Sequence, residues 1–205
     1  MPIPSKGSAP QSLRLFDANG DGATDLMVFI PYQDPTFFLN EQKKDAGGPR
    51  SSFVNLSLKP DFGQGQLAKL QPASLTLLRD GKRSNLMVAS GSYVRILKLD
   101  AENRLKVLDQ LSGRNSESKL KAGTPIDLDG DGTDEVVFLD SAVNSIEVLR
   151  KKADGTYGIS GQVKLPKLQF VRLDARDLDG DQREDLVIYG KSQTAVFYSK
   201  KSQPD

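Results

Sequence analysis

The sequence predicts an all-β fold, a β-propeller built of four-stranded antiparallel blades, with about four blades on this chain. One observation is an acidic nine-residue loop that occurs three times between extended segments. A second is the spacing of about 50 residues between units of the same shape, which is typical of propeller blades. The third is a series of short β-branched or aromatic segments at even spacing, with no convincing amphipathic helix.

Four repeats account for most of the 205 residues. We expect blades at 12–72, 73–121, 122–167 and 168–200, between an N-terminal extension at 1–11 and a tail at 201–205. The first repeat is about ten residues longer than the others, so the Pro-, Gly- and Lys-rich stretch 32–52 is interpreted as an insertion. The fourth repeat is expected to be incomplete, because only three strand candidates follow residue 168.

The strands are expected in the following order along the chain. In the first repeat, Ser12–Phe16 and Leu26–Ile30 flank the acidic loop, and Ser52–Lys59 and Gln66–Leu70 come after them. The second repeat has a strand-turn-strand stretch at Leu75–Val88, followed by Tyr93–Leu99 and Arg104–Leu111. The third has Ala122–Leu128, Glu135–Leu139, Ser145–Arg150 and Tyr157–Leu165, and the fourth has Phe170–Leu173, Asp185–Tyr189 and Thr194–Ser199.

The acidic loops are Asp17–Asp25, Asp127–Glu135 and Asp177–Asp185, with oxygen-bearing side chains at positions 1, 3, 5 and 9 and Gly at position 4. Carboxylates that converge in a tight turn repel one another unless a hard cation lies between them. Ligands that are all oxygen, in a flexible loop, favour Ca²⁺, and the carbonyl of position 7 would complete the shell. The expected ligands of up to three Ca²⁺ ions are Asp17, Asn19, Asp21, Ala23, Asp25, Asp127, Asp129, Asp131, Thr133, Glu135, Asp177, Asp179, Asp181, Arg183 and Asp185.

The residues that flank these loops argue against an EF-hand. An EF-hand needs a bidentate Glu at position 12 and a helix on each side. Position 12 is occupied by Val28, Phe138 and Ile188, each within a short apolar run that predicts a buried strand. The predicted unit is therefore strand, calcium loop, strand.

The DxDGDGxxDL pattern followed by a Val/Ile-rich strand resembles the FG-GAP or VCBS repeat of integrin-like calcium-binding β-propellers. The resemblance covers Ser12 to Ser199 and implies structural calcium; propellers of that family usually have about seven blades. Three features depart from its pattern. Gln182 replaces the position 6 Gly, where a left-handed backbone is usual. Glu135 replaces Asp at position 9, which leaves Asp134 as an alternative ligand, and the turn at Asp80 has no calcium site.

Composition excludes several classes of function. The net charge is +1 and the Lys and Arg residues are scattered, so nothing indicates a nucleic-acid or membrane partner. The chain has neither His nor Cys, which excludes Ser-His-Asp and Cys-His catalysis. We therefore expect no enzyme, but a scaffold for recognition or adhesion whose calcium is structural, with a protein as the partner and a glycan as the alternative. A secreted, periplasmic or cell-surface location follows from the millimolar calcium that such open loops need.

The competing interpretation is part of a secreted polysaccharide lyase or phospholipase, or a lectin-like protein, which the resemblance also implies. Within the recognition interpretation, the leading contact site is the insertion within Tyr32–Ser52, with Phe37 and Phe38 as apolar anchors. The missing fourth strand of the last repeat would expose an edge near Phe197. Further blades, or pairing with a second copy, are expected to complete the propeller.

Overall fold

The computed structural model describes residues 9–45, 48–63, 65–114, 116–121, 123–130, 134–166 and 169–199, apart from the side chains of 43–45, 48–50 and 171. Residues 1–8 of the expected extension and the tail at 201–205 lie outside this part of the chain. Neither of the two 3₁₀ helices found there is long or apolar enough to cross a membrane.

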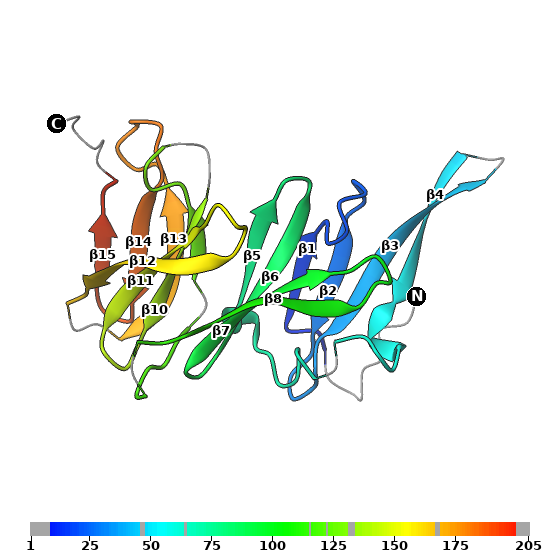
Figure 1. Cartoon of the computed structure of the whole chain (residues 1–205), viewed down its shortest axis with the longest axis horizontal. Helices are drawn as coiled ribbons and strands as arrows, with labels where there is room; N and C mark the ends of the chain where they lie inside the picture. Colours follow the sequence, from blue (N-terminus) through cyan, green and yellow to red (C-terminus); the bar gives the residue numbers. More distant parts are fainter. Residues whose placement is uncertain are drawn as a thin grey trace. The chain divides into compact units, whose positions relative to one another are not determined.

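The described chain folds into four antiparallel sheets, each formed by strands that follow one another in sequence (Figure 1). Sheet 1 contains β1 (Ser12–Phe16), β2 (Asp25–Phe29), β3 (Thr36–Asp45) and β4 (Gly48–Asn55). Sheet 2 contains β5 (Leu75–Asp80), β6 (Arg83–Ser90), β7 (Tyr93–Leu99) and β8 (Leu105–Ser112). Sheet 3 contains β9 (Thr124–Ile126), β10 (Glu135–Asp140), β11 (Ser145–Lys151) and β12 (Tyr157–Lys164), and sheet 4 contains β13 (Phe170–Arg176), β14 (Asp185–Gly190) and β15 (Thr194–Phe197). The all-β prediction is confirmed.

The stretch 32–52 is not an insertion, which corrects the sequence interpretation. It contains β3 and most of β4, which pair from Phe38↔Asn55 out to Asp45↔Gly48. The expected strand Gln66–Leu70 is a series of turns, and Ser52–Lys59 ends in the 3₁₀ helix η1 (Leu56–Leu58). The extra residues of the first repeat therefore lie between β4 and β5, where η2 (Pro72–Ser74) precedes the second sheet.

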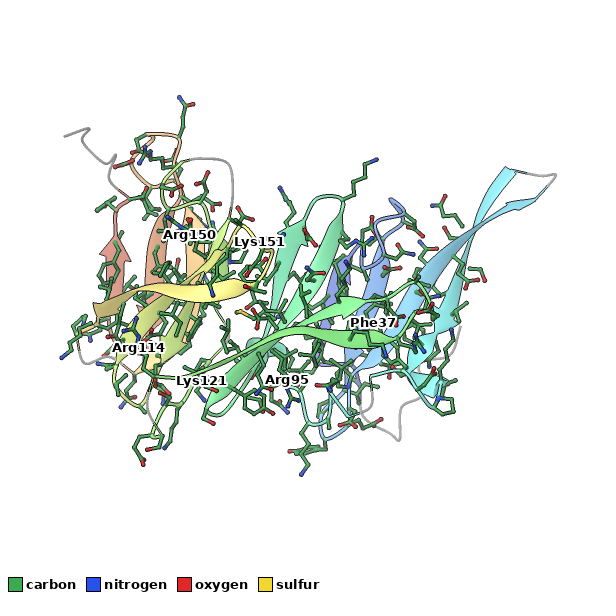
Figure 2. The ribbon with its side chains drawn as sticks, viewed as in Figure 1. Phe37, Arg95, Arg114, Lys121, Arg150 and Lys151 are labelled. Atoms are coloured by element: carbon green, nitrogen blue, oxygen red, sulfur yellow. The ribbon has the colours of Figure 1, made fainter. Side chains whose placement is uncertain are left out.

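Phe37 and Phe38 belong to the core and are not contact residues. Both side chains have no exposed surface. Because neighbouring residues of a strand point to opposite faces of the sheet, both faces of β3 are covered here. The Phe37 ring packs edge-on against Phe16 at 5.5 Å between centroids and also contacts Phe62 (Figure 2). Phe38 packs with Val28 and other apolar residues on the opposite face. The expectation that they anchor a partner was wrong.

The chain divides into two compact units, and sheet 2 contributes to both. Unit 1 combines sheet 1 with Arg79–Leu86 and Leu97–Leu108. Unit 2 combines Ala73–Leu78 and Met87–Ile96 with sheets 3 and 4.

Within unit 2 the sheets stack face to face through β10. Val136 and Phe138 pack against Met87, Ile96 and other residues of sheet 2. Val137 and Leu139, which point the opposite way, pack with Ile188 and its neighbours in sheet 4. All six residues of β10 are buried, so the unbroken apolar run at this position follows from the burial of both faces. Within unit 2, sheet 3 therefore lies between sheet 4 and the part of sheet 2 that belongs to this unit.

Candidate metal-binding loops

The three acidic loops each join the first two strands of a sheet, as the sequence predicts. Loop 1 (17–25) lies between β1 and β2, loop 3 (127–135) between β9 and β10, and loop 4 (177–185) between β13 and β14. Loop 3 is described at 127–130 and 134–135, so the expected ligands Asp131 and Thr133 lie outside the described residues. The strand–loop–strand arrangement of all three agrees with the exclusion of an EF-hand.

The position 1 carboxylate organises each turn by accepting hydrogen bonds from backbone N–H groups. In loop 1, Asp17 Oδ1 accepts from Gly20 N at 2.7 Å and its Oδ2 from Gly22 N at 2.8 Å. In loop 4, Asp177 accepts from Gly180 N at 2.7 Å and from Gln182 N at 3.0 Å. These bonds curl the backbone around the first carboxylate, so that the following side chains converge on it.

Position 4 of all three loops, and position 6 of loops 1 and 4, adopt the left-handed backbone that the sequence pattern predicts. At position 4, φ is +83° at Gly20, +76° at Gly130 and +83° at Gly180. At position 6, Gly22 has φ of +84° and Gln182 has φ of +69°. Gln182 therefore adopts a left-handed backbone conformation that costs a residue with a side chain about 1 kcal/mol more than glycine.

The position 9 carboxylate is buried and links the loop to the third strand of its sheet or, in loop 4, to the segment just after that strand. Asp25 has no exposed surface; its Oδ2 accepts from Ala18 N at 2.8 Å and its Oδ1 from Asn40 N of β3 at 2.8 Å. Asp185 accepts in the same way from Leu178 N at 2.9 Å and from Ser199 N at 3.0 Å. Burial raises the pKa of Asp25, and the hydrogen bonds from Asn40 N and Ala18 N oppose that rise. Position 9 is therefore both a candidate ligand and a structural link.

Loop 3 uses an arginine where the other two loops use a backbone N–H. Glu135 Oε2 accepts from Leu128 N at 3.0 Å, and its Oε1 accepts from the Arg150 Nε of β11 at 2.8 Å (Figure 2). The same guanidinium donates to Asp129 at 2.7 Å. Burial raises the pKa of Glu135, and the Arg150 charge opposes that rise. Glu135 rather than Asp134 is thus the position 9 residue of this loop.

Two of the loops gather three carboxylates closely enough to hold a metal ion. Oxygens of Asp127, Asp129 and Glu135 all lie within 4.8 Å of one another, and so do oxygens of Asp177, Asp179 and Asp185. Oxygen-only donors at this spacing suit a hard divalent cation. Loop 1, all of whose residues are described, has no such trio, because its position 3 is the amide of Asn19.

The second sheet retains a buried polar residue, Asn85, at the place of position 9, although its turn lacks the acidic pattern. Asn85 precedes Leu86-Met87-Val88 just as Asp25 precedes Leu26-Met27-Val28. Its side chain is 1% exposed, and its Nδ2 donates to Asp80 Oδ2 at 3.2 Å. An alignment on the following strand, rather than on the acidic pattern, would have identified this residue.

Arginines at position 7 form a second recurring feature that the acidic pattern does not reveal. Counted back from position 9, Arg83 and Arg183 both occupy position 7. A Cβ built on Gly20 would lie 3.5 Å from Arg83 Cβ, and one built on Gly130 would lie 3.4 Å from Arg183 Nε. In both cases the arginine of one sheet lies against the position 4 glycine of the preceding loop, so the missing side chain there makes room for it.

Comparison with known proteins supports the repeat assignment in the second half of the chain. A family model described as an FG-GAP-like repeat matches residues 127–198. This segment begins at the first residue of loop 3 and includes loop 4 with the strands that follow each. No curated protein matches the chain. Residues 127–198 are therefore similar to an FG-GAP-like repeat, as their loops and strands suggested.

Proposed function

We propose that this chain is a calcium-stabilised propeller module that serves as a scaffold for recognition of a protein partner outside the cytoplasm. The observation that supports it best is the pair of carboxylate trios at equivalent positions of loops 3 and 4. Each trio lies next to a buried strand, where the repulsion of three carboxylates opposes folding; in loop 3 the single charge of Arg150 offsets only part of it. A bound cation would remove that repulsion and would hold the first two strands of each sheet together.

The ion's role in this proposal is structural. In loop 4 the carboxylates of Asp177 and Asp185 already accept two backbone hydrogen bonds each, so they fix the loop while offering their remaining oxygen lone pairs to the ion. A site supplied mainly by protein carboxylates leaves little charge for polarising a substrate. We therefore assign no catalytic step to the loops.

Thermal unfolding with calcium and with chelator tests the proposal. An ion that binds only the folded state, at a hundredfold excess over its Kd, adds about 2.7 kcal/mol per site, which raises Tm by several degrees. Asp179→Ala should reduce the calcium-induced rise, while Asp80→Ala, at the turn without an acidic loop, should leave that rise unchanged. Equal melting temperatures with chelator and with excess calcium would refute calcium binding.

A further inference from the structure

A cavity of about 770 Å³ lies within unit 1, beside loop 1. Asn19, Gly20 and Asp21 of the loop line one side of it. Arg83 of β6, Lys98 of β7 and the turn at 100–103 line the rest. Small-molecule and side-chain binding sites commonly have volumes of a few hundred to about 1,000 Å³.

The two carboxylates in the lining already have partners inside the protein. Asp21 Oδ1 accepts from Ala23 N at 2.7 Å and its Oδ2 from the Asn19 amide at 2.9 Å. Asp100 forms an ion pair with Arg104 at 3.0 Å and accepts from two backbone N–H groups. Asp100 is therefore neutralised by Arg104, whereas Asp21, whose partners are uncharged, keeps its negative charge. With Arg83 and Lys98 against Asp21, the lining carries one more positive than negative charge.

The two cations in the lining have no such partner. Arg83 and Lys98 are both partly buried, and neither forms an ion pair with any residue in the described part of the chain. A partly desolvated charge without a counterion costs free energy, so the site favours a ligand of opposite charge.

The backbone holds Arg83 at the cavity. Ser84 N, the next residue, donates to the Asp17 carbonyl of loop 1 at 2.6 Å. A Cβ on Gly20 would lie 3.7 Å from Arg83 Nε, so the missing side chain lets the guanidinium stem lie against the loop. The arginine is thus fixed before any ligand arrives, which lowers the entropy cost of binding.

We propose that this cavity binds a carboxylate of an acidic peptide segment, with Arg83 as the forked donor and Lys98 as the second positive charge. A guanidinium pairs with a carboxylate through two parallel hydrogen bonds, and an ammonium adds a point charge. No aromatic ring lines the cavity, so the stacking surface that sugar sites commonly use is missing from it. This inference rests on the proposed recognition function, and it identifies the chemical group of the partner that the chain would recognise.

Nuclear magnetic resonance titration of the whole chain, in excess calcium, tests this site with two blocked tripeptides. N-acetyl-Gly-Asp-Gly-amide should shift the signals of the Arg83 Nε–H and the Gly20 amide, and the peptide with Asn in place of Asp should not. Arg83→Gln and Lys98→Gln should each weaken binding about tenfold, as expected for loss of a charged hydrogen bond. Lys82→Gln is the matched control, because Lys82 is exposed and does not line the cavity.

Equal binding of the Asp and Asn peptides, or an equal effect of Lys82→Gln and Arg83→Gln, would overturn the proposal. Tighter binding of a galacturonate trimer than of the Asp peptide would show that the ligand is an acidic glycan and would refute the peptide assignment. If calcium does not change Tm but the Asp peptide still binds through Arg83 and Lys98, the anion site stands and the calcium function fails. The two measurements therefore distinguish the two proposals.

Discussion

Gln182 has a backbone conformation that normally requires glycine. Its φ of +69° is the conformation that Gly22 adopts at the same position of loop 1. We expect Gln182→Gly to stabilise the folded state by up to about 1 kcal/mol, because glycine relieves the strain of a left-handed backbone. Gln182→Ala keeps a Cβ and should bring no gain. Urea unfolding of the three proteins would show this, and a stabilising alanine would refute the strain explanation.

Arg150 sets loop 3 apart from the other two loops. Its guanidinium pairs with Asp129 and Glu135, two of the three carboxylates that could hold an ion. We expect Arg150→Gln to raise the calcium affinity of loop 3 about tenfold, because a positive charge next to the ion is removed. Without calcium, the same variant should be less stable, since the buried Glu135 loses its counterion.

Calorimetric calcium titration would measure this effect in a background that carries Asp17→Asn and Asp177→Asn to weaken the other two loops. Arg95→Gln is a suitable control, because Arg95 donates to Gln110 at 2.7 Å and lies over the Tyr93 ring. An Arg150→Gln variant with unchanged or lower calcium affinity would show that the ion pair does not compete with the metal.

The spacing of acidic residues in the sequence identified the candidate ligands, but not the ion-pair and hydrogen-bond partners that these residues have in the folded protein. The predicted carboxylates of loops 3 and 4 come together because they lie a few residues apart in a turn. Arg150 could not be assigned to loop 3 from sequence, because it lies on the third strand and reaches the loop through strand pairing. The links from Asp25 to Asn40 and from Asp185 to Ser199 arise in the same way.

At the scale of elements, prediction located most strands, including the largely exposed β8, β12 and β15, but missed β3, which begins with buried residues. The expected strand starting at Glu135 corresponds to β10, whose two faces are both covered, and Tyr93–Leu99 corresponds to β7 residue for residue. The outer half of the β3–β4 hairpin is rich in Lys, Gly and Pro, so it carries none of the apolar alternation that marks a strand. The hairpin is held by pairing with itself, which composition does not reveal.

Gly123, just before β9, is required by the close approach of two backbone segments. A Cβ at this position would lie 1.8 Å from the Val137 carbonyl oxygen, so the backbone itself would have to move. Thr76 Oγ1 also donates to the Gly123 carbonyl at 2.7 Å. We expect Gly123→Ala to destabilise the protein by about 2 kcal/mol or more.

Gly161→Ala is the matched control, because its Cβ would make only an ordinary contact with Val148 at 3.8 Å. Its effect should stay within about 0.5 kcal/mol. Denaturant unfolding compares the two variants directly, and equal losses would mean that the close approach at Gly123 relaxes at little cost.

For the whole molecule, the face of β1 that carries Leu13 and Leu15 offers an apolar contact that a second copy could cover. These two leucines, which point the same way along the strand, are 53% and 65% exposed. We propose that two copies associate through this face. Leu15→Lys should then shift the protein from dimer to monomer in light scattering, since a charge at such a contact is costly.

Leu58→Lys serves as the control, because Leu58 is 77% exposed but belongs to the η1 helix and not to β1. It should leave the oligomeric state unchanged. A wild-type protein that remains monomeric at micromolar concentration would contradict the pairing and would leave a ring closed within one chain, or completed by other blades, as the better account.

The burial of both faces of β10 also determines how unit 2 unfolds. In a stack where each sheet touches only its neighbours, cooperativity passes from one interface to the next. Val136 and Phe138 belong to one interface, and Val137 and Leu139 to the other, so the two interfaces share a single strand. Loss of β10 would break both at once. Sheets 3 and 4 and the residues of sheet 2 that belong to unit 2 are therefore expected to unfold in a single transition, rather than one sheet at a time.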